Sequence, residues 1–69
     1  MARHHEHWYI KRLQKHYNDN YIQHDEEIEW FANSEPNKWR FRIPSMKLEI
    51  TLICEDDETI TAIGQTYKD

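Results

Sequence analysis

Apolar and polar residues alternate along two stretches in the second half of the chain, and each alternation predicts a β-strand. In residues 38–43, Trp39, Phe41 and Ile43 share one face, and basic residues occupy the other. In residues 47–54, every second position is again apolar, namely Leu48, Ile50, Leu52 and Cys54. A period of two with one wet face is typical of an antiparallel sheet.

The loop between these strands predicts how they pair. A four-residue loop over residues 44–47 sets Ile43 opposite Leu48 on the apolar face. On the wet face it brings Arg42 opposite Glu49, which is a favourable pair. A two-residue loop keeps the same faces but sets Arg42 against a lysine. We therefore expect the four-residue loop.

A third strand follows, and its pairing leaves an apolar surplus. A three-residue loop at residues 55–57 sets Leu52 opposite Ile60, so that apolar residues stay together. Ile53 and Ile63 then fall on the wet face. Either that face is partly covered, or a bulge near the single glycine shifts the register.

The first half of the chain predicts helical cover for this sheet. Within residues 3–17, Ile10, Leu13 and Tyr17 recur at helical spacing. Residues 18–20 are Asn, Asp and Asn, whose side chains bond nearby backbone groups and favour turns. We therefore expect one long helix that ends before residue 18.

Residues 21–33 fit two structures. Asp25 can cap a short helix over residues 25–32, with Glu26 and Glu27 in its acidic first turn. Residues 27–30 also alternate as a strand would. We favour the helix, because the cap and the helix-forming residues agree.

The pattern as a whole predicts one α+β domain over residues 1–69. One or two N-terminal helices pack on a three-stranded antiparallel meander, which gains a fourth strand if residues 26–32 are extended. Nine aromatic residues (three Trp, four Tyr and two Phe) favour a packed core. A chain this short buries only about 60% of its unfolded surface, so its stability is marginal.

Composition narrows the functional classes. The net charge of −4 disfavours a general nucleic-acid binder, which is usually basic. No apolar run is long enough to span a membrane, and the first residues lack the apolar core of a signal peptide. Cys54 is the single cysteine and cannot form an internal disulfide, so we expect a cytoplasmic protein. Nothing in the chain indicates a cofactor.

Two acidic clusters are candidates for binding a larger protein. They consist of Asp25, Glu26, Glu27 and Glu29, and of Glu55, Asp56, Asp57 and Glu58. On a small rigid domain such clusters mimic phosphates and occupy a basic groove on a partner. The ordinary alternative is that the first cluster starts a helix and the second forms a polar loop.

Surplus apolar and aromatic residues point to the same class of function. Trp30 is one of three tryptophans, more than so small a core easily buries, and Ile53 and Ile63 lack a place in it. The leading hypothesis is a non-enzymatic protein-binding module, from a phage or other mobile element, that inhibits or modulates a larger host protein. Such a chain is either a monomer or a homodimer that pairs through an edge strand, residues 38–43 or 59–67.

The alternative function is a small metal-free ribonuclease. One helical stripe carries His5, Tyr9, Arg12 and His16 at steps of four, three and four residues. A general base, a cation for the phosphate and a positioning hydroxyl are what such cleavage needs. Helices that precede an antiparallel sheet are similar to the architecture of small bacterial ribonuclease toxins.

The histidines near the N-terminus give a weak metal hypothesis. His4 and His7 are three residues apart, so one helical face can present both. Zinc sites need three or four protein ligands, which only His24 or Cys54 could supply through folding. A polar N-terminus explains the cluster more simply.

Overall fold

The computed structural model describes residues 4–32 and 35–68 and shows an α+β fold. Its helices and strands are α1 (Glu6–Asn20), η1 (Ile22–Glu27), β1 (Glu29–Trp30), β2 (Lys38–Ile43), η2 (Pro44–Met46), β3 (Leu48–Cys54) and β4 (Ile60–Thr66). The four strands form one antiparallel sheet in the order β1-β2-β3-β4. The expected helix-then-meander architecture is confirmed, in its four-stranded form.

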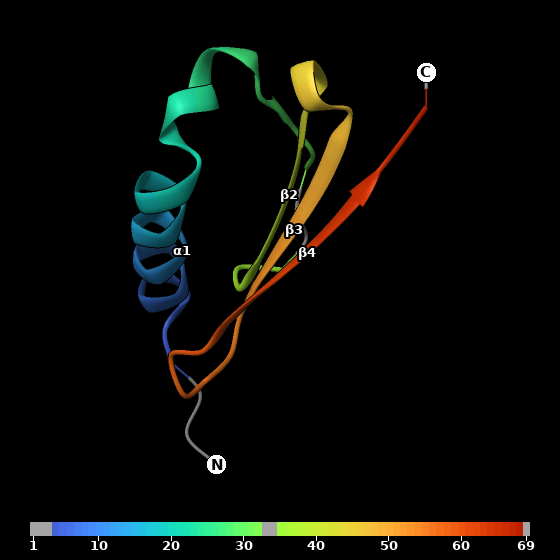
Figure 1. Cartoon of the computed structure of the whole chain (residues 1–69). Coiled ribbons are helices and arrows are strands. Elements are labelled where there is room, and N and C mark those ends of the chain that lie inside the picture. The colour runs from blue at the N-terminus through green and yellow to red at the C-terminus, as the bar shows by residue number, and fades with distance from the viewer. Residues whose placement is uncertain (1–3, 33–34, 69) are drawn as a thin grey trace.

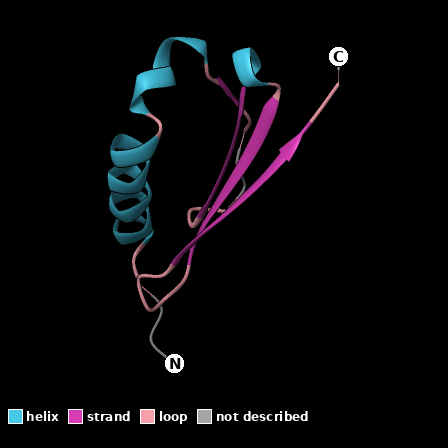
Figure 2. Cartoon of the chain, in the orientation of Figure 1, coloured by secondary structure: helices cyan, strands magenta, loops and turns pink. Residues whose placement is uncertain are grey.

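The helix α1 packs on one face of the sheet, so the molecule has two layers (Figure 1). We call this side the inner face and the opposite side the outer face. The core between helix and sheet consists of Tyr9, Leu13, Tyr17, Phe41, Ile43, Ile50, Leu52 and Cys54. Among the described residues, no helix covers the outer face (Figure 2).

The helix α1 runs three residues further than the sequence predicts. The expected helix covered residues 3–17, and residue 3 lies outside the described residues, whereas α1 ends at Asn20. Its last side chains bond one turn back along the helix: Lys15 Nζ lies 2.9 Å from Asp19, and Asn20 Nδ2 donates to the His16 carbonyl at 2.9 Å. The polar groups expected to end the helix therefore extend it.

The favoured helix over residues 25–32 is wrong, and the strand alternative is confirmed for Glu29–Trp30. A 3₁₀ helix, η1, begins earlier and ends at Glu27, after which the chain becomes extended. The Trp30 ring then lies 4.9 Å from that of Phe41 and 5.2 Å from that of Tyr17, between ring centroids. Packing against the core thus outweighs the local preference for a helix.

The first hairpin has the predicted register. Ile43 lies opposite Leu48 and Arg42 opposite Glu49 across the four-residue loop. Lys47 closes that loop in the left-handed region, with φ 51°.

The second hairpin is shifted by two residues from the prediction. Leu52 lies opposite Ala62, not Ile60, because the loop spans five residues instead of three. Within the loop, the Asp57 carboxylate accepts the Thr59 N–H at 3.0 Å. A slip of two residues leaves every side chain on its predicted face.

The strand β4 is an edge of the sheet. Among residues 4–32 and 35–68 it pairs only with β3, continuously from Leu48↔Thr66 to Cys54↔Ile60, so the bulge expected near Gly64 is absent. Every β4 residue after Ile60 is exposed, and the C-terminal end of β4 extends away from α1 (Figure 1). The other candidate edge, residues 38–43, lies inside the sheet between β1 and β3.

Candidate functional site

The outer face carries a cluster of charged, aromatic and apolar side chains from all four strands and their ends. Strand pairing sets Arg42 beside Glu49 and Glu49 beside Gln65. The Phe31 N–H donates to the Arg40 carbonyl at 3.1 Å, which continues the pairing beyond β1. The outer-face cluster consists of Phe31, Arg40, Arg42, Glu49, Ile53, Ile63, Gln65 and Tyr67.

Glu49 lies at the centre of this cluster and is only 8% exposed. Its Oε1 accepts a hydrogen bond from Arg42 Nε at 3.2 Å. Its Oε2 accepts from Arg40 Nη2 at 3.2 Å and from Gln65 Nε2 at 3.5 Å. The hydrogen bond from Arg40, followed by that from Arg42, lowers the pKa of Glu49. Glu49 is therefore a fixed anion that orients two arginines.

Aromatic rings hold the other sides of the two guanidinium groups. The Arg40 Cζ lies 4.8 Å from the centroid of the Phe31 ring. The Arg42 Cζ lies 5.2 Å from the same centroid and 4.3 Å from that of Tyr67. Such contacts contribute about 0.5–1 kcal/mol each at exposed sites. Both arginines are thus held in place before any partner arrives.

The arrangement leaves binding groups accessible. The side chains of Arg40 and Arg42 remain 48% and 37% exposed, so guanidinium N–H groups can still reach solvent. Ile63, two residues from Gln65 on the same face, is 50% exposed. Ile53, on the neighbouring strand, is half-buried. The outer face can therefore bind carboxylates beside an apolar group.

The two acidic clusters predicted as binding sites lie at opposite ends of the molecule (Figure 1). In the first, the Tyr17 hydroxyl donates to Asp25 at 2.6 Å, and the Ser45 hydroxyl donates to Glu27 at 2.7 Å. Burial, followed by the bond to Asp25, raises the pKa of Tyr17. Glu29 lies opposite Arg42, whereas Glu26 is exposed.

The second cluster forms the loop between β3 and β4. The Tyr9 hydroxyl donates to Asp56, and Glu58 forms an ion pair with Arg12. Hydrogen bonds from Thr59 lower the pKa of Asp57, and Glu55 is exposed. Several carboxylates of both clusters therefore serve contacts within the chain, and the two clusters do not form one surface.

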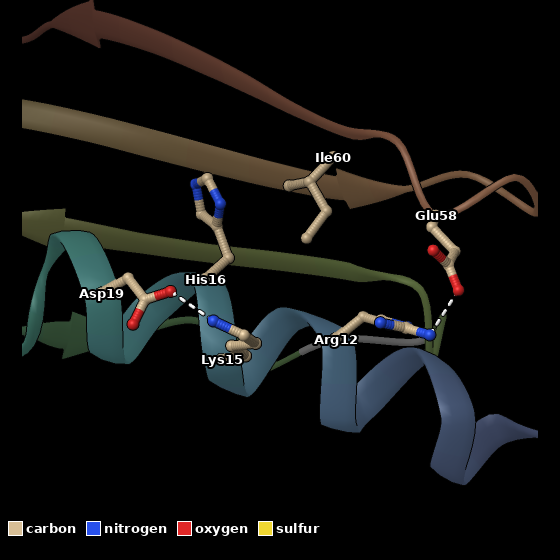
Figure 3. A pocket seen from close by; sticks show the side chains of 6 residues that line it. All are labelled: Arg12, Lys15, His16, Asp19, Glu58 and Ile60. Carbon is tan, nitrogen blue, oxygen red and sulfur yellow. Dashed lines mark hydrogen bonds and ion pairs between the residues drawn. The ribbon is translucent and has the colours of Figure 1, made fainter.

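The residues of the ribonuclease hypothesis do not meet at one point. Tyr9 is 3% exposed and lies in the core. Arg12 and His16 line a hollow of about 200 Å³ between α1 and the start of β4, together with Lys15, Asp19, Glu58 and Ile60 (Figure 3). His5 lines a different hollow with Glu6, His7 and Ile10. Lys15 and Arg12 each already have a carboxylate partner in the first hollow. Lys15 pairs with Asp19, and Arg12 pairs with Glu58 (Figure 3).

Among the described residues, the predicted metal pair of His4 and His7 gains no third ligand. The His4 ring stacks on Trp8 with centroids 3.6 Å apart, and its Nε2 lies 2.8 Å from the Asp56 carbonyl oxygen. Within residues 4–32 and 35–68, no three His, Cys, Asp or Glu side chains could hold a metal ion together. Cys54 is fully buried, and burial raises the pKa of its thiol.

Trp30 is 47% exposed but belongs to the inner side, at the edge of the aromatic core. Glu29, Ile53 and Ile63 are the predicted binding residues that lie on the same face as the arginines. Sequence reasoning missed Phe31, Gln65 and Tyr67 as part of this surface. Extending the alternation of residues 27–30 by one position would have placed Phe31 on the face of Glu29.

Comparisons with known proteins identify no relative of this chain. No protein-family model, curated protein or solved structure matches the chain. Within the described part of the chain, no helix has the length and apolar character needed to cross a membrane.

Proposed function

We propose that this chain is a non-enzymatic protein-binding module that holds a larger protein against its outer face. The observation that carries the proposal is the pair of partly exposed arginine side chains fixed by Glu49 on the same face as exposed Ile63. Arginine and aromatic residues provide much of the binding energy at protein interfaces. Because these side chains are already ordered, less entropy is lost when a partner binds.

The chemistry of the face favours an acidic segment with an apolar anchor. The outer face presents Lys38, Arg40 and Arg42 against Glu29 and Glu49, in a chain whose net charge is −4. An acidic partner is attracted to this face and repelled by the acidic ends, which fixes its orientation. Inhibition or modulation of a larger host protein is the biological role we favour for this binding.

We place the main contact with the partner on the outer face, whereas the sequence pointed to the acidic clusters. The cluster carboxylates of Asp25, Asp56 and Glu58 already bond within the chain. A basic groove on a partner would have to compete with those bonds.

Selection from a library of random displayed peptides, with the folded chain as bait, tests this proposal. We expect enriched peptides to combine Asp or Glu with an aromatic or aliphatic residue. Their binding should shift backbone NMR signals of Arg40, Arg42 and Ile63. The double variant Arg40→Gln/Arg42→Gln should weaken binding by about tenfold or more, since hydrogen bonds to charged groups contribute about 1.5–3 kcal/mol.

The matched control is Arg12→Gln, which neutralises an arginine that is likewise paired with a glutamate but lies on α1. It should bind the selected peptides as wild type does. Enrichment of basic peptides that shift the signals of residues 55–58 would instead return the site to the acidic loop and overturn the proposal.

A further inference from the structure

We infer that two copies of this chain associate through β4, joining their sheets into one continuous antiparallel sheet. Within the described part of the chain, β3 is the only neighbour of this strand, so its other side is free. This inference goes beyond the outer-face proposal and shares Ile63 with it; otherwise it depends on backbone groups and on the sequence of β4.

The backbone bonds next to β4 show which of its groups are free. The Tyr67 N–H donates to the Lys47 carbonyl at 3.0 Å, and the Glu55 N–H donates to the Thr59 carbonyl at 2.7 Å. Odd-numbered positions therefore bond toward β3, and successive residues of a strand alternate in direction. The N–H and C=O groups that point to the free edge belong to Ile60, Ala62, Gly64 and Thr66.

This edge lacks the usual protection against pairing. Natural edge strands are shortened, bulged, or carry charges or proline. The strand β4 has seven residues, none of them charged or proline, and pairs with β3 without a bulge. At the opposite edge, β1 has only two residues, one of which is Glu29. The sheet is therefore open to extension at β4.

One antiparallel register of β4 with its own copy uses the whole strand. With a two-fold axis at Ile63, Ala62 bonds to Gly64 of the second copy, and Ile60 bonds to its Thr66. The free groups of both strands then face one another, as an antiparallel ladder requires. Each Ile63, 50% exposed in the single chain, packs against the same residue of the other copy.

The composition of β4 supports a second copy as the occupant. The paired strands themselves oppose no like charges. The two-fold axis is perpendicular to the sheet, so both α1 helices lie on one face. Ala62 and Gly64 between them are small and leave room for this arrangement.

A disulfide across the axis tests the register. In Ile63→Cys, the two cysteines form a pair without hydrogen bonds, with Cα atoms about 4.5 Å apart, which suits a disulfide. In Thr61→Cys they lie roughly 13 Å apart along the strands. Under mild oxidation we expect a covalent dimer of Ile63→Cys only, with buried Cys54 unreacted in both variants. Equal cross-linking of the two, or none, overturns the inference.

Sedimentation equilibrium provides a test without oxidation. Wild type should dimerise with a Kd below about 1 mM. Ile63→Lys sets two lysines against each other and should weaken dimerisation by about tenfold, because like charges directly opposite repel and the apolar contact is lost. Thr61→Lys faces Gln65 of the second copy and should dimerise as wild type does. A wild type that stays monomeric, or equal effects of the two lysines, contradicts the inference.

Discussion

At the scale of single residues, Glu49 is the most informative side chain. It is the only charged residue among the described residues that is buried, yet it lies on the outer face. Burying a carboxylate is costly unless charged hydrogen bonds replace water. Arg40 and Arg42 provide those bonds, so Glu49 couples the stability of the sheet to the arrangement of the outer-face cluster.

This coupling predicts a specific pH dependence. Because the folded state lowers the pKa of Glu49, its stabilising effect is fully present above the unfolded pKa of about 4.3. That effect is lost as the pH falls through the lower folded pKa. Glu49→Gln should therefore melt at a lower temperature than wild type at neutral pH, and the difference should shrink in acid. Thermal melts from about pH 7 to pH 2 would show it.

The control for this measurement is Glu26→Gln, because Glu26 is exposed. Its melting temperature should run parallel to that of wild type across the same range. Parallel curves for Glu49→Gln as well would show that the two arginines do not favour the charged carboxylate.

The sequence predicted part of this site. The pairing of Arg42 with Glu49 follows from alternation and one loop length, both of which are local. The rings of Phe31 and Tyr67 could not be placed, because Phe31 depends on a strand formed against the core and Tyr67 on a bond from its N–H to Lys47. The alternation of apolar and polar residues does not reveal contacts that depend on tertiary packing.

At the scale of elements, the two hairpins show where local rules suffice. The first was predicted correctly because a repulsive pair excluded its main competitor. The register of the second hairpin was predicted wrongly, because three- and five-residue loops leave the side chains on the same faces. The conformation of the turn residues decides between the two loop lengths. Glu58 adopts φ 75° there, while Asp57 bonds to Thr59, and such left-handed positions are usually signalled by glycine or asparagine.

The loop of the first hairpin gives a prediction at this scale. Lys47 has φ 51°, a conformation that costs a non-glycine residue about 1 kcal/mol. Lys47→Gly should raise the free energy of unfolding by up to about 1 kcal/mol in urea denaturation. Met46→Gly, one residue earlier in η2 and without positive φ, should lower it by about 0.5–1 kcal/mol. Destabilisation by both would mean that the Lys47 side chain contributes more than its backbone strain costs.

At the scale of the whole molecule, stability depends on one small core between α1 and the sheet. Leu13 is fully buried there, whereas Ile22 is 51% exposed. Leu13→Ala should cost about 2–5 kcal/mol. That loss is a large part of the roughly 3–10 kcal/mol expected for a chain of this length.

Urea denaturation followed by circular dichroism checks this expectation, with Ile22→Ala as the control. The control should change the free energy of unfolding by less than about 0.5 kcal/mol. Similar losses for both variants would mean that η1 is as firmly packed as α1.

The shortness of β1 has a consequence for the final size of the assembly. A chain with two open sheet edges can add copies at both and polymerise into a fibre. Here one edge ends in a two-residue strand with a glutamate, so only the other accepts a strand. In the proposed dimer, growth therefore stops after a single addition, because β1 leaves no second edge that accepts a strand.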